Sequence, residues 1–321
     1  MEIPPNIATQ IINWFSQKLR IVIISHRNPD ADSIGSNLAL RQLLEAWGNQ
    51  VTSACVDPAP KELSFLPHGT TFQTNFNLEE TDLIICVDAG STAQTGFLDR
   101  QPEILQSNKP LINIDHHPSN NGYGTVNLII DNAASTTLVI YNLFKLFGIT
   151  ITSKIATCLL CGLYYDTGSF MHSNVDEEVY QMASDLMRAG ADMHTITKNM
   201  YKTRSIEQLK TWGMILDNMK VTSNNIVVGG ITQQELQNCN ATTVETSGVI
   251  DFLSVVKDAE FATLLVEDNK GNIRGSFRTR NSELNLSEMA GVFGGGGHKK
   301  ASGFSLQGEL KKETIWTIKP E

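Results

Sequence analysis

The first 190 residues alternate short apolar runs with amphipathic helical patterns, and this alternation limits the fold more than any other feature. Most of the runs are too short for helices and lack polar alternation, which is typical of strands buried on both faces. They cover residues 21–25, 50–56, 82–88, 110–115 and 125–130, and the helical patterns cover 33–48, 134–147, 152–165 and 176–190. Strands that alternate with helices predict a doubly wound parallel α/β sheet.

A second, smaller α/β domain is predicted after a polar helical segment. Strand patterns cover 224–232, 259–268 and 271–279, and a helix near 284–293 leads into a glycine run. The 321 residues suffice for two cores of ordinary size. We therefore expect a first domain over 1–191, a helical connector over 192–219 and a second domain over 220–321.

Charge and cysteine content narrow the classes of protein. The 25 basic and 34 acidic residues give a net charge of −9, which argues against a general polyanion-binding surface. No secretion signal and no apolar run of membrane-spanning length is present in the sequence, so we expect a cytoplasmic protein without a membrane partner. The five cysteines are odd in number, and Cys158 and Cys161 lie in an apolar helix, where we interpret them as packing residues.

Acids and imidazoles follow the ends of three predicted strands and one helix. Because ligands of parallel sheets bind outside the carboxyl ends of the strands, these side chains are expected to converge. They are His26, Asp30, Asp32, Asp88, Asp115, His116, His117 and Asp166.

Each of these residues alone has an ordinary structural explanation. Asp30, Asp32 or Asp88 could cap a helix, and His26 could be a loop histidine. Together, carboxylate oxygens and imidazole nitrogens suit a site for two divalent ions, of which manganese fits the donor set better than zinc or iron. Such a pair of ions activates water and stabilises an in-line displacement at phosphorus. The joint pattern therefore predicts a centre for phosphoester or phosphoanhydride hydrolysis.

The motifs resemble those of the DHH phosphoesterase family. Four lie in the first domain, as "SHRNPDADSIGS", "ICVDAG", "NIDHHPSN" and "LYYDTGSF", and the DHH triplet is residues 115–117. "GSFRT" and "GGGGHKKASG" resemble the DHH-associated C-terminal domain. The branch most similar to the chain is that of bifunctional oligoribonucleases and pAp phosphatases, also called nanoRNases.

The resemblance implies a role for each residue of the first domain. One ion would be held by His26, Asp30 and Asp88, and the other by Asp32, Asp88, His116 and Asp166, so that Asp88 bridges the ions. Asp115 would orient an imidazole, and His117 would face the scissile phosphate and stabilise the leaving oxygen.

The second domain would bind the substrate, with the active site in the cleft between the domains. Arg278 and His298 match the phosphate-binding positions of the family, and Arg280 is a weaker candidate. The glycine run lets backbone N–H groups approach a phosphate, which makes Gly295, Gly296 and Gly297 substrate-binding candidates, although a linker would have a similar composition.

The leading hypothesis is a phosphodiesterase and phosphomonoesterase that cleaves short single-stranded RNA to mononucleotides and adenosine 3′,5′-bisphosphate (pAp) to AMP. The cofactors would be two divalent ions, with manganese favoured and magnesium, cobalt or zinc as alternatives. Dinucleotides and nucleoside bisphosphates are the expected partners, and a homodimer is left open. The alternatives are an inorganic pyrophosphatase or exopolyphosphatase, a phosphodiesterase of linear or cyclic dinucleotides, and a non-catalytic nucleotide-binding module.

Overall fold

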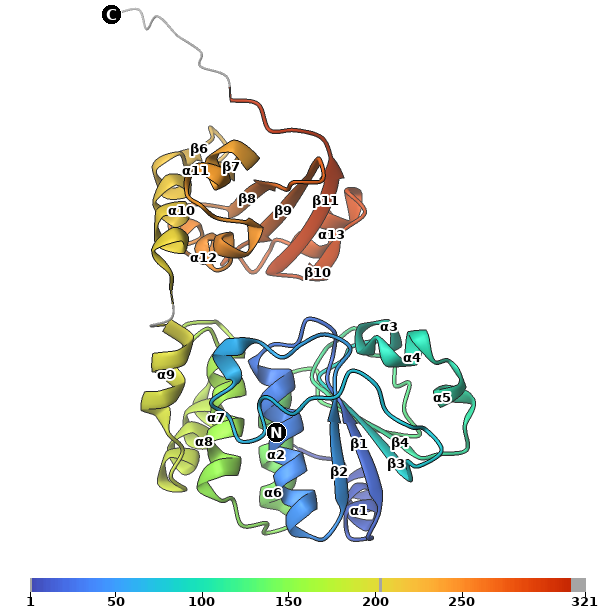
Figure 1. Ribbon diagram of the computed structural model, residues 1–321. Helices are drawn as coiled ribbons and strands as arrows, with labels where there is room; N and C mark the ends of the chain where they lie inside the picture. Colours follow the sequence, from blue (N-terminus) through green and yellow to red (C-terminus); the bar gives the residue numbers. More distant parts are fainter. Residues whose placement is uncertain (1, 202–203, 313–321) are drawn as a thin grey trace, which may run out of the picture. The chain divides into compact units, whose positions relative to one another are not determined.

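The computed structural model describes residues 2–201 and 204–312, and the chain divides into two compact units (Figure 1). The first unit is Met1–Thr203 and the second is Arg204–Glu321. Two helices lie in the segment expected to connect the domains, and the division falls between them. These are α9 (Met193–Tyr201) in the first unit and α10 (Ile206–Asp217) in the second.

A five-stranded sheet, parallel throughout, forms the centre of the first unit, as the sequence predicted. Its order is β2-β1-β3-β4-β5, so the direction of winding reverses between β1 and β3. Ligands of such sheets bind at the carboxyl ends of the strands near this reversal. The strands are β1 (Arg20–Ile24), β2 (Gln50–Ala54), β3 (Leu83–Val87), β4 (Leu111–Asp115) and β5 (Val126–Ile129).

Helices cover both faces of this sheet, with the longer ones on one side and three short ones on the other (Figure 1). Ile21 and Ile23 of β1 pack in the larger core, whereas Val22 and Ile24 pack in the core that the short helices close with residues such as Phe97. Alternate residues of one strand thus serve two cores. The helices are α1 (Pro5–Phe15), α2 (Ala31–Ala46), η1 (Lys61–Leu63), α3 (Thr92–Thr95), α4 (Phe97–Arg100), α5 (Glu103–Gln106), α6 (Thr136–Leu146), α7 (Ser153–Asp166) and α8 (Glu177–Arg188).

The start and end of α2 follow from local chemistry. The side chain of Asp30 accepts hydrogen bonds from the backbone N–H groups of Asp32 and Ser33, both at 3.0 Å, and so caps the helix. Gly48, just beyond the end of α2, has φ of +90°, a conformation that glycine adopts readily and that ends the helix. The cap fixes the loop between β1 and α2, which carries His26 and Asp30, and the start of the helix, which carries Asp32.

The second unit has a six-stranded mixed sheet in the order β10-β11-β9-β8-β7-β6, in which only β7 and β8 pair in parallel among the described strands. Two separate cores pack on it, one around Leu264 and Val266 and one around Phe277 and Leu286. Half of the glycine run is an edge strand, β10, rather than a loop. The elements besides α10 are β6 (Lys220–Val221), β7 (Ile226–Ile231), α11 (Gln233–Asn238), η2 (Thr243–Thr246), α12 (Val249–Leu253), β8 (Phe261–Glu267), β9 (Asn272–Arg278), α13 (Leu286–Val292), β10 (Gly296–His298) and β11 (Ala301–Gln307).

Candidate metal centre

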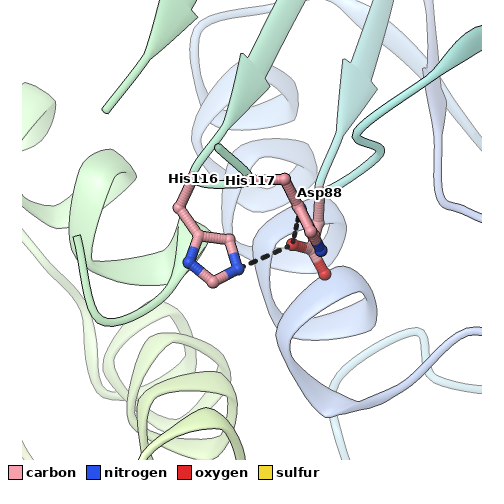
Figure 2. Close-up of side chains that lie close together, drawn as sticks. All are labelled: Asp88, His116 and His117. Atoms are coloured by element: carbon pink, nitrogen blue, oxygen red, sulfur yellow. Dashed lines mark ion pairs between the residues drawn. The ribbon is translucent and has the colours of Figure 1, made fainter. Parts of the chain in front are cut away.

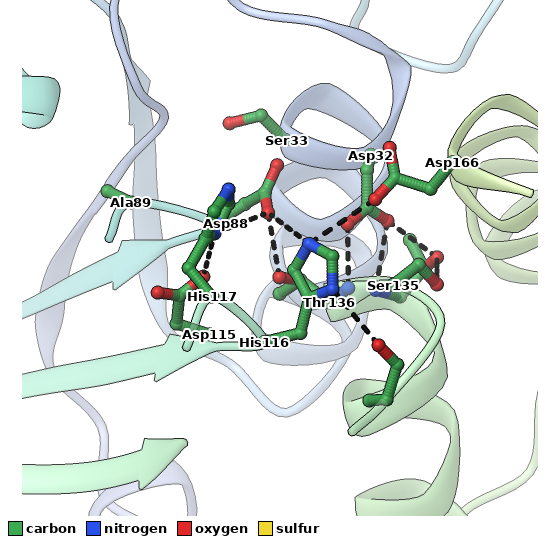
Figure 3. A network of polar contacts seen from close by, with 12 residues as sticks. Asp32, Ser33, Asp88, Ala89, Asp115, His116, His117, Ser135, Thr136 and Asp166 are labelled. Carbon is green, nitrogen blue, oxygen red and sulfur yellow. Dashed lines mark hydrogen bonds and ion pairs between the residues drawn. The ribbon is translucent and has the colours of Figure 1, made fainter. Parts of the chain in front are cut away.

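The first unit brings together all eight acids and imidazoles singled out in its sequence. They come from the carboxyl ends of β1, β3 and β4, the start of α2 and the last residue of α7. Figure 3 shows six of them, all except His26 and Asp30. Three groups among the described residues have ligand atoms within 4.8 Å of one another. The groups are His26, Asp30 and Asp88; Asp88, His116 and His117; and Asp32, His116 and Asp166.

Asp88 links these groups because its two oxygens face different imidazoles. Oδ2 lies 3.4 Å from Nε2 of His26. Oδ1 lies 3.6 Å from Nε2 of His116 (Figure 2). Each of these imidazoles also faces a second acid. Nε2 of His26 lies 3.6 Å from Oδ1 of Asp30, and Nε2 of His116 lies 3.3 Å from Oδ2 of Asp166. This arrangement offers oxygen and nitrogen donors to two ions that share one carboxylate.

Backbone carbonyls hold the Nδ1 protons of His26 and His116. Nδ1 of His26 donates to the carbonyl of Arg27 at 2.8 Å, and Nδ1 of His116 donates to the carbonyl of Ala133 at 3.1 Å. A carbonyl only accepts, so Nδ1 carries the proton in both rings. Each ring therefore directs Nε2, the nitrogen that can coordinate a cation, at the carboxylates.

The adjacent His117 has a different partner. Its Nδ1 lies 2.7 Å from Oδ1 of Asp115, which is buried. The other oxygen of Asp115 accepts from Nδ2 of Asn120 at 2.6 Å, and the same amide nitrogen lies 3.1 Å from the carbonyl of Ala89. Burial lowers the pKa of His117, but the hydrogen bond to Asp115 and the nearby charge of Asp88 outweigh it, so the pKa is raised overall.

The start of α6 holds two of the acids, and sequence reasoning missed this contribution. The backbone N–H groups of Thr136 and Thr137 donate to Asp32 at 2.6 and 3.0 Å, and the Thr137 hydroxyl donates to it at 2.7 Å. The Thr136 hydroxyl donates to Asp88 at 2.9 Å. A helix N-terminus favours a carboxylate. The sequence did contain a signal for this contribution. The run Ser135-Thr136-Thr137 stands at the start of a helical pattern, and Ser135 is the N-cap of α6.

The acids of the centre strongly influence one another. Burial, followed by the charges of neighbouring carboxylates, raises the pKa of Asp32 and of Asp166 well above the usual range. Burial opposes ionisation of Asp88 too, but the hydrogen bond to His26 and the charges of the imidazoles lower its pKa. Burial lowers the pKa of His26, but bonds to Asp30 and Asp88 raise it to about 12 overall. A cluster with this much buried negative charge fits divalent cations.

Arg278 in β9 and His298 in β10, two of the substrate-binding candidates, lie on the sheet of the second unit. Residues paired across antiparallel strands point to the same side of the sheet. His298 pairs with Ala301, and Ala301 pairs with Arg278, so His298 and Arg278 share one face. Nε of Arg278 donates to Asp251 at 3.2 Å, and Arg280 is exposed beyond the end of β9.

The three glycine candidates differ in what a side chain would meet. A Cβ at Gly295 would lie 2.1 Å from the carbonyl oxygen of Gly303, and one at Gly297, where φ is +140°, would lie 2.6 Å from that of Ala301. These two positions therefore need glycine for the packing of β11. A Cβ at Gly296 would meet nothing within 4 Å, so the backbone there is open to a ligand.

Comparison with known proteins identifies both units. Residues 20–163 match the DHH family, N-terminal domain, and residues 225–318 match the DHHA1 domain. With this pair of domains and its acid and imidazole cluster, the chain is a metal-dependent phosphoesterase, a hydrolase of phosphate esters. It carries the DHH and DHHA1 domains in this order and so is a DHH–DHHA1 protein.

Relatives resemble the chain over most of its length. It is 28% identical over 302 residues to the bifunctional oligoribonuclease and PAP phosphatase NrnA of Bacillus subtilis, a match that covers 93% of each chain. The enzyme of the same name from Thermus thermophilus is 26% identical, over 90% of this chain and 84% of its own. The crystal structure of an exopolyphosphatase-related protein from Bacteroides fragilis superimposes with a TM-score of 0.87 at 26% identity, covering 97% of this chain and 93% of that one.

No helix among the described residues combines the length and apolar character needed to cross a bilayer.

Proposed function

We propose that the protein hydrolyses short single-stranded oligoribonucleotides to mononucleotides and pAp to AMP, using two manganese ions. The observation that carries the proposal is the position of Asp88, whose two oxygens face separate groups of donors. The similarity over nearly the whole chain to enzymes named for both activities supports this choice of substrates. Carboxylates with imidazoles form a donor set that suits manganese.

The residues divide into two sets of ligands and a set that acts on the substrate. His26, Asp30 and Asp88 would hold one ion, and Asp32, Asp88, His116 and Asp166 the other. When bound, the ions supply activation of a water molecule and neutralisation of the charge on the phosphate. Asp30 would act both as a ligand and as the cap of α2, which is consistent with its two backbone hydrogen bonds.

His117 would serve the leaving oxygen. Its Nδ1 bonds to Asp115, and the carboxylate favours the protonated ring. The ring can then donate a proton to the oxygen that departs from phosphorus, while Asp115 keeps its orientation. In the second unit, Arg278 and His298 would bind a phosphate of the substrate, with the open backbone at Gly296 as a further donor.

The proposed substrates are short because the chain offers little to a long strand. The net charge is −9, and the sequence has no extended basic stripe along which a phosphate backbone could lie. We therefore expect a preference for di- to pentanucleotides and little activity on duplexes. Because the exopolyphosphatase-related protein has the same fold at 26% identity, polyphosphate is the second candidate substrate.

The test is a product assay with the purified chain, stripped of metal and then supplied with manganese. The substrates are a diribonucleotide, pAp, polyphosphate, pyrophosphate and RNAs of increasing length, and the control is Asp88→Asn. We expect mononucleotides from the dinucleotide and AMP from pAp. Turnover of polyphosphate or pyrophosphate alone would refute the proposal. A rate that stays flat out to about 25 nucleotides would refute the preference for short strands, because it requires a continuous single-strand channel.

A further inference from the structure

A pocket of about 270 Å³ lies within the second unit, next to the proposed phosphate-binding arginine. Arg274, Ser276 and Arg278 occupy alternate positions of β9, so their side chains share one side of the sheet. On β8, Leu264 and Val266 pair with Ser276 and Arg274 and form an apolar floor. The segment of η2 closes the rim with hydroxyl groups, those of Thr243, Thr246 and Ser247.

The charge of this pocket favours an anion. Two guanidinium groups line it, and no acid is found among the described residues of its lining. Asp251 and Asp268 stand beside the arginines rather than in the lining. Nε of Arg274 lies 3.8 Å from Asp268, which is too long for a hydrogen bond, and the Arg274 side chain is 62% exposed. The N–H donors of the Arg274 guanidinium group are therefore available to a ligand.

We propose that this pocket binds the non-scissile phosphate of a nucleotide substrate, with Arg274 as a specificity-determining residue. The inference rests on the proposed function, because Arg278 lines the pocket and is also the residue proposed to contact the substrate. A guanidinium group matches the oxygens of a phosphate ester, and the apolar floor suits the carbon face of a ribose. The volume is close to the lower limit of about 300 Å³ for small-molecule sites.

The ligand class follows from these dimensions. A phosphate with part of its ribose fills such a pocket, whereas a whole oligonucleotide does not. Substrates that carry a second phosphate, such as a nucleoside 3′,5′-bisphosphate or a 5′-phosphorylated dinucleotide, would use the pocket. Adenosine 3′-monophosphate and an unphosphorylated dinucleotide would leave it without its anion.

The experiment compares substrates that differ only in this phosphate, using Arg274→Gln and Arg274→Lys. We expect Arg274→Gln to lower kcat/KM for the bisphosphate about 10- to 100-fold and for the 3′-monophosphate less than about twofold. Arg274→Lys keeps the positive charge but lacks the planar arrangement of N–H donors, so its decrease in kcat/KM for the bisphosphate should be intermediate. Folding should survive, because Asp268 still accepts from the backbone N–H groups of Lys270 and Asn272.

The matched control is Lys270→Gln, which removes one positive charge from the turn of the same hairpin and should leave both substrates unchanged. Equal losses on the two substrates, or no loss on either, would overturn the inference. Calorimetric binding of AMP to the metal-free protein tests the pocket without hydrolysis, and we expect about tenfold weaker binding in Arg274→Gln. If the wild type hydrolyses no nucleotide but its AMP binding depends on Arg274, the proposed function fails and the pocket stands. If AMP binding is the same in both proteins, the pocket fails.

Discussion

At the scale of single residues, Asp88 combines three costs that a purely structural residue would avoid. It is 2% exposed, it ends an apolar strand, and its φ of +57° lies in the left-handed region that favours glycine. Hydrogen bonds and ion pairs from His26, His116 and Thr136 compensate for the buried charge. Strain and burial of this kind concentrate at functional sites.

Replacing Asp88 by Asn should lower manganese-dependent turnover by about a thousandfold or more, because the shared ligand loses its charge. The variant keeps the shape of the side chain, so the fold should persist. The measurement is kcat on pAp together with the metal content of the purified protein. Asp99→Asn, the same change at an exposed position of α4, is the control. Near-normal turnover of Asp88→Asn would show that Asp88 does not bridge the ions.

Asn120 should affect turnover without affecting metal content. Its side chain bonds to Asp115, to the carbonyl of Ala89 and to the side chain of Asn113, so it fixes the carboxylate that orients His117. We expect Asn120→Ala to lower kcat about 10- to 100-fold, the range typical of residues that orient a catalytic group through one neighbour. Asn121→Ala, at the exposed next position, is the control. If the two variants have equal activity, Asn120 has no positioning role.

At the scale of elements, the centre depends on the close packing of α2, α6 and α7. A Cβ at Gly35 of α2 would lie 2.5 Å from the carbonyl oxygen of Cys158 in α7. A Cβ at Gly162 of α7 would lie 2.5 Å from the Cγ2 of Thr137 and 2.7 Å from Oδ1 of Asp32. These two glycines therefore set how near the helices approach the acids they carry.

Gly162→Ala should reduce stability by about 1–3 kcal/mol, because overpacking forces backbone or side chains to shift. The same shift displaces Asp32, so manganese affinity should fall as well. Denaturant unfolding and a metal titration measure both effects. Gly213→Ala is the matched control, since Gly213 is exposed in α10 and a Cβ there meets nothing within 4 Å. Alanine at that site should stabilise by about 0.5–1 kcal/mol. A Gly162→Ala variant as stable as the control variant would contradict this account.

The elements also show which parts of the structure a sequence can predict. The strands of the first sheet and the acids at their ends were predictable, because each acid interrupts an apolar run. The roles of Thr136 and Thr137 were not, since they depend on Asp32, about a hundred residues earlier in the chain. The helices α3, α4 and α5 have four residues each, too few to show a period, and α1 was missed.

At the scale of the whole molecule, the resemblance of motifs recovered the pair of domains, and the matches to the DHH and DHHA1 families confirm it. The pocket beside Arg278 left no trace in the sequence. Its lining comes from η2, α12, β8 and β9, and single polar residues on separate elements do not form a motif. The metal centre is also assembled from several segments, but its acids and imidazoles fall at strand ends and in recognisable motifs. A site whose residues lie in no motif requires the fold.

The electrostatics of the metal-free protein lead to a last prediction, on pH. His26, Asp32 and Asp166 all have raised pKa values in the folded chain. Through these three groups the folded, metal-free chain binds more protons than the unfolded chain above pH 4, and their contribution to its stability must fall as the pH rises. For His26 this loss begins near its ordinary pKa of 6.5 and continues toward about 12. The lowered pKa of Asp88 acts in the opposite direction, but only below its ordinary value of 3.8.

Manganese binding requires these groups without their protons, so it should release protons and stabilise more at high pH. We expect the rise in Tm on adding saturating manganese to be several degrees larger at pH 8 than at pH 5.5. Thermal unfolding with and without metal measures the difference, and titration calorimetry in two buffers of different ionisation enthalpy measures the protons released. His26→Gln removes one titrating ligand and should reduce the proton release. An equal rise in Tm at both pH values would mean that the cluster is already deprotonated without metal, and the proposed coupling between acids and ions would be wrong.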